Sequence, residues 1–200
     1  MGLSACDAHR TPGVSVQGKI EKMGLRTSPM AQVYFDRCEI PAENRIGHDG
    51  KGAFIFGESM LWERACILAS AVGSMERLLE ASVSYAKERR QFGSPIGSFQ
   101  YVAGRIVDMK MRLEASRHQL YHSAWLLSKG RNCFLEAAMT KLQVSEAWCR
   151  SCEDAIQIHG GSGYTVDFEL ERELRDAVGS RLYSGTSEMQ RNIIAGLLGL

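Results

Sequence analysis

Four short stretches of the sequence hold residue types that can do chemistry or support it. In the first stretch, Glu63 precedes Arg64 and has apolar residues three and four positions away, at Met60 and Ile67. This spacing predicts a helix that holds the carboxylate against apolar surface, and desolvation of that kind favours proton uptake by a general base. A glutamate on a helix surface that pairs with a neighbouring cation would give the same pattern. Both interpretations stay open from the spacing alone.

The second stretch, Glu88–Gly93, contains Arg89 and Arg90 at the expected end of a helix. The helix dipole favours cations at this end by about 0.3–1 kcal/mol each, so the two arginines need no ligand. An anionic ligand such as a pyrophosphate would also suit them. The stretch is compatible with either role.

The third stretch, Gln157–Tyr164, contains three glycines in four positions, Gly160, Gly161 and Gly163. Glycine lets the backbone approach a ligand closely or adopt a positive φ, although the end of a helix requires only one glycine. His159 precedes them and is interpreted, on its own, as a packed residue more readily than as a catalyst.

The fourth stretch, Tyr183–Gln190, predicts a tight turn followed by a helix N-terminus. Free backbone N–H groups and the helix dipole at such an end favour a phosphate or a carboxylate. A well-capped C-terminal helix without a ligand explains the same residues. The sequence has no glycine pattern of the Rossmann or P-loop type and no ordered Ser/His/Asp set.

The elements that must position these stretches are mostly helices, because apolar residues recur at three- and four-residue steps after Gly52. The predicted helices span about 53–90, 98–129, roughly 133–158, about 169–177 and 187–198. Ser98 is the expected N-cap of the second helix, and Ser187 with Gln190 has the spacing of a capping box. Long helices with one apolar stripe each and short connections predict an antiparallel bundle.

Residues 1–47 differ in composition, with three of the four prolines and short alternating runs. Val14–Val16 and Val33–Phe35 are predicted strands, with turn residues near Pro12 and Pro41. So few residues do not form an independent β domain, so we expect the end of a sheet whose other strands lie elsewhere. The prediction is a mainly α chain with a partial β domain at 1–47 and a helical bundle at 48–200.

Composition excludes several classes of protein. The 200 residues are 44% apolar, and 24 basic against 23 acidic residues give a net charge of +1, which argues against disorder and against nucleic acid as a partner. The longest apolar stretch, at about 65–73, is too short for a membrane span of about 20 residues. Cys149 and Cys152 lack the further ligands of a zinc ribbon, so we expect small core residues and no metal site. The sequence shows no secretory signal, so a cytoplasmic location is expected.

Taken in their order, the four stretches resemble the acyl-CoA dehydrogenase family. The matching residues are Gly47 and Gly52 before Leu61–Arg64, then Arg89–Ile96, Phe99 and Gln100, Gln157–Tyr164, Arg175–Ala177 and Gly185–Glu188. The resemblance covers essentially the whole chain. It implies that residues 48–200 form the family's C-terminal four-helix bundle and that residues 1–47 are the end of its middle β domain.

The resemblance implies an enzyme that desaturates an acyl thioester between Cα and Cβ with FAD as cofactor. A carboxylate removes the α-proton while the β-hydrogen leaves as hydride to the flavin. Most of the family carries this base just before the Gly-Thr of the last motif, where this sequence has Ser184, which cannot serve. In the isovaleryl-type and long-chain branches the base precedes an arginine in the first long helix, as Glu63 precedes Arg64 here. The resemblance therefore implies Glu63 as the catalytic base, with Arg64, Ser184 and Gly185 at the substrate.

The residues that the resemblance implies for cofactor binding fall into two groups. Contacts to the FAD of a neighbouring subunit would come from Arg89, Gln100, Gln157, Ile158, His159, Gly160 and Gly161. Contacts to the FAD bound by the chain's own β domain would come from Thr186, Ser187 and Glu188. This division implies a homo-oligomer, either a dimer or a tetramer.

The resemblance also bears on the substrate. Residues 62–69 are similar to those of a branch that oxidises acyl groups, such as prolyl, on peptidyl or acyl carrier proteins. CoA and a carrier-protein arm both stay open as the thioester, and an electron-transferring flavoprotein and oxygen both stay open as the electron acceptor. The family's N-terminal helical domain is missing from the sequence, so we expect a fragment of such an enzyme. The alternative is a non-catalytic helical module kept for oligomer contacts.

Overall fold

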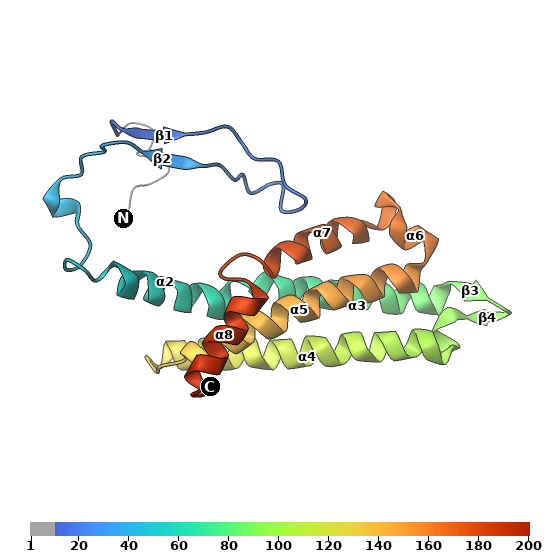
Figure 1. Ribbon diagram of the computed structural model, residues 1–200. Coiled ribbons are helices and arrows are strands. Elements are labelled where there is room, and N and C mark those ends of the chain that lie inside the picture. Colours follow the sequence, from blue (N-terminus) through green and yellow to red (C-terminus); the bar gives the residue numbers. More distant parts are fainter. Residues whose placement is uncertain (1–10) are drawn as a thin grey trace. The chain divides into compact units, whose positions relative to one another are not determined.

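The computed structural model describes residues 11–200 (Figure 1). Contacts divide the chain into two compact units between Glu58 and Ser59, within helix α2 (Gly52–Cys66). The predicted domain boundary after residue 47 stays a prediction. In the part of the chain that is described, no helix is long and apolar enough to cross a bilayer.

The first unit contains a short antiparallel hairpin. Strands β1 (Val14–Val16) and β2 (Val33–Phe35) pair along their full length, which confirms both predicted strands. Gly13 precedes β1 with a φ of +83°, and a Cβ at this position would lie 2.4 Å from the carbonyl oxygen of Asp36, so only glycine fits there. The apolar side chains of β2 are exposed, and it stays a prediction that the hairpin belongs to a larger sheet. A 3-10 turn, η1 (Ala42–Asn44), follows.

The predicted first helix, over 53–90, is two helices in the structure, so the prediction of a single helix was wrong. α2 ends at Cys66 and α3 spans Ala69–Glu88, because the backbone at Leu68 has a ψ of 14° where a helix needs about −42°. The two helices bury different clusters. α2 packs with residues 126–137 through Leu61 and Ala65, whereas α3 faces the main core. The bend lets each apolar side reach its own cluster, and no Gly or Pro marks it in the sequence.

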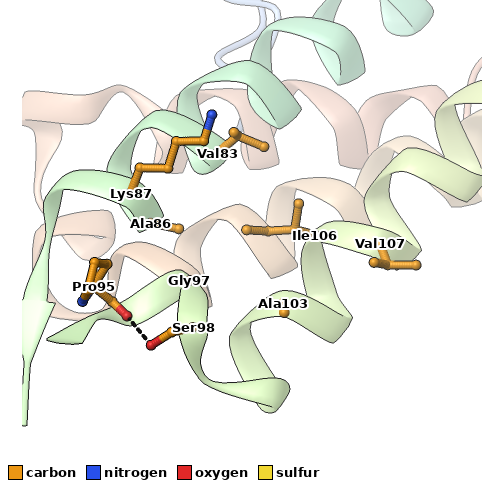
Figure 2. Close-up of a pocket in the computed structure, with 9 residues that line it drawn as sticks. All are labelled: Val83, Ala86, Lys87, Pro95, Gly97, Ser98, Ala103, Ile106 and Val107. Carbon is orange, nitrogen blue, oxygen red and sulfur yellow. Dashed lines mark hydrogen bonds between the residues drawn. The ribbon is translucent and has the colours of Figure 1, made fainter.

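The connection after α3 lies between the predicted first and second helices. It contains strands β3 (Arg90–Gln91) and β4 (Ser94–Pro95) and the 3-10 turn η2 (Ile96–Ser98), and it leads into α4 (Gln100–Ser128). The N-cap of α4 is Phe99, so the prediction that Ser98 caps the helix was wrong. The Ser98 hydroxyl instead donates to the Pro95 carbonyl at 2.7 Å, because η2 turns the side chain back toward β4 (Figure 2).

Helix α5 is the centre of the second unit. The remaining elements are α5 (Phe134–His159), α6 (Gly161–Tyr164), the 3-10 turn η3 (Val166–Phe168), α7 (Leu170–Ser180) and α8 (Ser187–Leu197). α5 packs against α3, α4, α7 and α8, and the helices α3, α4, α5 and α7 alternate in direction (Figure 1). The predicted antiparallel four-helix bundle is thus confirmed, with Met75, Leu113 and Val144 deep in its core.

The two spaced cysteines lie in this core. Cys149 and Cys152 are buried on α5, as predicted for small core residues. Burial raises the pKa of the Cys149 thiol to about 11 and raises the pKa of the Cys152 thiol further, because an apolar surrounding disfavours the thiolate. Both are therefore inert thiols at neutral pH.

Helix α8 begins differently from the prediction. Thr186 is its N-cap, with the hydroxyl oxygen accepting a hydrogen bond from the Met189 N–H at 3.3 Å. The capping box of Ser187 and Gln190 was wrong, because both side chains have tertiary partners: Ser187 donates to Glu146 on α5 at 2.6 Å, and Gln190 donates to the preceding turn.

Candidate active site

The end of α2 meets the turn between α7 and α8. The Ser184 hydroxyl donates to the carboxylate oxygen Oε1 of Glu63, and the Nε of Arg64 donates to the Ser184 carbonyl oxygen at 3.1 Å. The predicted base, its neighbouring arginine and the serine at the alternative base position are therefore in direct contact. Ser184 is about 120 positions away from Glu63 and Arg64 in the sequence.

The turn itself has an unusual backbone. Ser184 has a φ of 56° and Gly185 a φ of +90°, both in the left-handed region. A Cβ on Gly185 would lie 2.7 Å from Nε2 of Gln190, so the turn needs glycine there. Gln190 is fully buried and donates to the carbonyl oxygens of Ser184 and Gly185 at 3.2 and 3.0 Å. We call Glu63, Arg64, Ser184, Gly185 and Gln190 the Glu63–Ser184 cluster.

Burial and charge shape this cluster. Glu63 and Arg64 are half-buried. Desolvation lowers the pKa of the Arg64 guanidinium, and the charge of Glu63 partly opposes this. Tyr183, directly before the turn, has its phenol pKa raised, first by burial and then by Cys149 and Glu63. The cluster thus combines a carboxylate and a cation in a partly buried place, with the neutral phenol of Tyr183 next to it in the sequence.

Lys141 on α5 is a charged group that the sequence reasoning missed. Its side chain is fully buried, and its Nζ has no hydrogen-bond partner among the described residues. Burial, followed by the charge of Arg64, lowers the pKa of this lysine to about 8, although Glu146 and Glu188 oppose the shift. The signal was present, because Lys141 stands four residues after Ala137 and three before Val144, on an apolar stripe.

The first turn of α8 adjoins the cluster. Thr186 and Ser187 use their hydroxyls within the chain, one as the helix cap and the other on Glu146, which also pairs with Arg181 at 3.1 Å. Glu188 is exposed; its own backbone N–H and the Thr186 hydroxyl lower the pKa of its carboxyl. Of these three predicted cofactor residues, Glu188 has the side chain most open to a ligand.

A second group of predicted residues surrounds a separate pocket of about 370 Å³, at the end of α5 and the β3–β4 hairpin. The residues that line it are Tyr85, Arg89, Gln91, Ile96, Ile158, His159, Gly160, Gly161 and Ser162. We call it the His159 pocket. Gln100, at the start of α4, and Gln157 are exposed and are not among its lining residues.

His159 is a packed residue at this pocket. Its ring stacks on Tyr85 with centroids 4.2 Å apart and lies against Phe168 at 5.1 Å. Burial lowers the pKa of the imidazole, although the hydrogen bond from Nδ1 to the Ala155 carbonyl, at 2.8 Å, opposes this. The ring is therefore neutral at pH 7, with Nδ1 as the donor. Its interpretation as a packed residue is supported.

The glycines beside His159 have distinct roles. Gly163 packs against α5, because a Cβ there would lie 2.5 Å from the Ile156 carbonyl oxygen. Gly160 and Gly161 have open space where a Cβ would stand. Their backbone is accessible at the pocket, which is what a closely approaching ligand needs.

A third hollow lies outside both groups. It has a volume of about 480 Å³ and is formed by α3, η2 and α4, with Val83, Ala86, Ile106 and Val107 as apolar walls (Figure 2). Lys87 is the charged residue on its lining. No residue that the sequence singled out for a functional role lines it.

A family model and several curated proteins are similar to this chain. The family model for the acyl-CoA dehydrogenase C-terminal domain matches residues 50–198. An L-prolyl-[peptidyl-carrier protein] dehydrogenase of Pseudomonas fluorescens is 43% identical over all of this chain and 53% of its own length. A short-chain acyl-CoA dehydrogenase of Megasphaera elsdenii is 36% identical over 94% of this chain and 49% of its own length. The chain spans about half the length of the curated relatives it matches.

Solved structures agree with this assignment. The crystal structure of the prolyl acyl carrier protein oxidase AnaB has a TM-score of 0.94 and 52% identity, over 95% of this chain and 50% of its own. PigA with FAD and proline has a TM-score of 0.92 and 43% identity, with the same coverage. The order of motifs, the antiparallel bundle and these matches together show that the chain belongs to the acyl-CoA dehydrogenase family.

Proposed function

We propose that this chain is the C-terminal part of an FAD-dependent enzyme that dehydrogenates an acyl thioester between Cα and Cβ, with Glu63 as the base. The contact between Glu63 and Ser184 supports this most directly. Ser184 occupies the turn position that carries the base in most of the family, and the carboxylate of α2 reaches it. A base supplied by α2 therefore ends beside the place where a base supplied by the turn would act.

The residues of the cluster divide the work as follows. Glu63 takes the proton from Cα, which is weakly acidic beside a thioester carbonyl, so a positioned base is required. Arg64 follows Glu63 on α2 and donates to the Ser184 carbonyl oxygen, so it holds the turn against the end of this helix. FAD, when bound, accepts the hydrogen that leaves Cβ as hydride. Ser184 and Gly185 then line the space for the acyl group.

The residues present fit a flavin dinucleotide. At the His159 pocket, Arg89 offers an exposed cation, and Gly160 and Gly161 leave room for a close approach to their backbone, which suits a pyrophosphate or ring carbonyl groups. Exposed Gln100 and Gln157, with Ile158 and His159, would complete the contacts to the FAD of a neighbouring subunit. Thr186, Ser187 and Glu188 would meet the cofactor of the chain's own subunit at the start of α8.

The relatives favour a carrier-protein thioester over CoA as the substrate. Two relatives above 40% identity are named as dehydrogenases of L-prolyl-[peptidyl-carrier protein], and one structural neighbour is a prolyl acyl carrier protein oxidase. We therefore propose a prolyl group, or a similar small cyclic acyl group, on a carrier-protein arm. Acyl-CoA is the second substrate to test, because relatives named as acyl-CoA dehydrogenases also match.

A homo-oligomer is part of the proposal. Helix α4 carries large apolar side chains that are exposed in the single chain: Tyr101, Val107, Met111, Tyr121 and Trp125. Exposed apolar side chains along one helix are typical of a surface that another subunit covers. An electron-transferring flavoprotein and oxygen are the two electron acceptors to compare.

The substitution Glu63→Gln tests the base. It should be made in the protein expressed from its complete reading frame, with L-prolyl-loaded carrier protein and butyryl-CoA as probes. Loss of the base should lower kcat by about 10²–10⁴-fold, while the visible flavin absorbance is retained. Glu80→Gln changes an exposed glutamate of α3 and should leave kcat unchanged. Desaturation by Glu63→Gln at the unsubstituted rate would refute the assignment, and a complete protein without bound flavin would favour the helical-module alternative.

A further inference from the structure

Ser184 holds two consecutive residues of α2 at once. Its hydroxyl donates to Oε1 of Glu63, and its carbonyl oxygen accepts from Nε of Arg64 at 3.1 Å. A donor and an acceptor on one residue therefore fix both the distance and the rotation of the turn relative to the end of α2. A side chain that merely lined a pocket would need neither bond.

The backbone of Ser184 is held from the other side by α8. The buried Nε2 of Gln190 also donates to the Ser184 carbonyl, at 3.2 Å, so this oxygen accepts from two helices. Ser184 has a φ of 56°, a conformation that a non-glycine residue keeps only where its surroundings over-determine it. The packed Gly185 and the Gln190 amide supply that constraint, and the result is a hydroxyl aimed at the carboxylate.

We propose that Ser184 is a positioning residue for Glu63: the Ser184 hydroxyl donates to Oε1 of the carboxylate and leaves Oε2 to take the substrate proton. This inference rests on the proposed role of Glu63 as the base. It explains why a serine is suited to the position that the family's usual carboxylate has vacated. A hydroxyl donor complements the carboxylate that has moved to α2, whereas glycine or alanine would give only space.

Two substitutions separate the hydroxyl from the backbone. Ser184→Gly removes the hydroxyl and relieves the left-handed strain, whereas Ser184→Ala removes the hydroxyl and keeps the strain. A hydrogen bond to a charged group is strong enough that both variants should lose about tenfold or more in kcat with KM little changed. Ser128→Ala, which removes a hydroxyl bonded to a main-chain carbonyl at the far end of α4, is the control.

Each outcome decides the proposal. Equal losses of kcat in Ser184→Gly and Ser184→Ala, with KM little changed, support a positioning hydroxyl. Loss in Ser184→Ala alone would assign the effect to backbone strain and overturn the proposal. A rise in KM at unchanged kcat would make Ser184 a pocket wall, which also overturns the proposal. Loss of desaturation in Glu63→Gln, with no effect of either Ser184 substitution, would leave the base in place and refute only its positioning by Ser184.

Discussion

The Glu63–Ser184 cluster and the His159 pocket contrast in how they satisfy their polar groups. In the cluster, the Ser184 hydroxyl donates to the Glu63 carboxylate, the side chains of Arg64 and Gln190 donate to the turn carbonyls, and Gly185 has no room for a Cβ. At the pocket, Arg89 is exposed, and Gly160 and Gly161 face open space. A closed site fixes catalytic geometry from the chain alone, whereas an open site is completed by a ligand. The contrast supports placing the base in the first and cofactor contacts in the second.

The largest expected effect on the free energy of unfolding comes from Lys141, the buried lysine of α5. Lys141→Met should raise the free energy of unfolding at pH 7 by up to about 3 kcal/mol, because a lysine pKa near 8 instead of 10.5 records the cost of burying its charge. Between pH 8 and 10.5 the unfolded lysine binds more protons than the folded one, so the stability of the unsubstituted protein rises with pH. The advantage of the variant should shrink across that window. Urea unfolding at several pH values measures it.

Lys87→Met, on the exposed last turn of α3, is the matched control and should leave the unfolding free energy almost unchanged. A Lys141→Met variant that is less stable than the unsubstituted protein at pH 7 would show that the buried ammonium has a favourable partner.

The second prediction concerns the closed turn. Gly185→Ala should destabilise the protein by about 1–3 kcal/mol, because the new methyl group meets Nε2 of Gln190 and the φ of +90° disfavours any side chain. It should also lower kcat, since the same turn holds Ser184 against Glu63. Thermal unfolding and steady-state kinetics on one preparation test both. A stable variant with normal kcat would show that the turn is more adaptable than its packing indicates.

The third prediction concerns the pH dependence of stability that His159 causes, which lies at lower pH than that of Lys141. The His159 pKa lies below 6.5 in the folded protein, so below pH 6.5 the unfolded state binds more protons and stability falls as pH falls. His159→Gln should remove part of this loss of stability at acid pH. The pH dependence of stability that Lys141 causes above pH 8 should not change. Identical acid unfolding curves for the two proteins would contradict a buried, neutral imidazole.

The smallest expected effect on stability is at Gly161, in the open backbone of the His159 pocket. Gly161→Ala should change the unfolding free energy by less than about 0.5 kcal/mol, because a Cβ there meets open space. It should nevertheless reduce flavin occupancy, measured by visible absorbance after dialysis, if a ligand approaches this backbone closely. Unchanged occupancy would remove Gly161 from the proposed cofactor contacts.

The fold was largely predictable, and its exceptions have tertiary causes. The helices around α4 and α5 follow from unbroken three- and four-residue apolar spacing, and the hairpin strands follow from alternation beside turn residues. The break at Leu68 carries no local signal, because it arises where two apolar faces pack into different clusters. Ser98 and Ser187 look like caps in sequence, but their hydroxyls bond Pro95 and Glu146 instead.

The sequence by itself determined the helical bundle, the family and the candidate base, because periodicity and ordered motifs are local or additive signals. Only the tertiary structure decided that Ser184 touches Glu63, that Arg64 and Gln190 share one carbonyl, and that Lys141 is buried. Those facts depend on how α2, α5 and α8 converge. Such convergence is set by packing between residues more than a hundred positions apart, which no local pattern encodes.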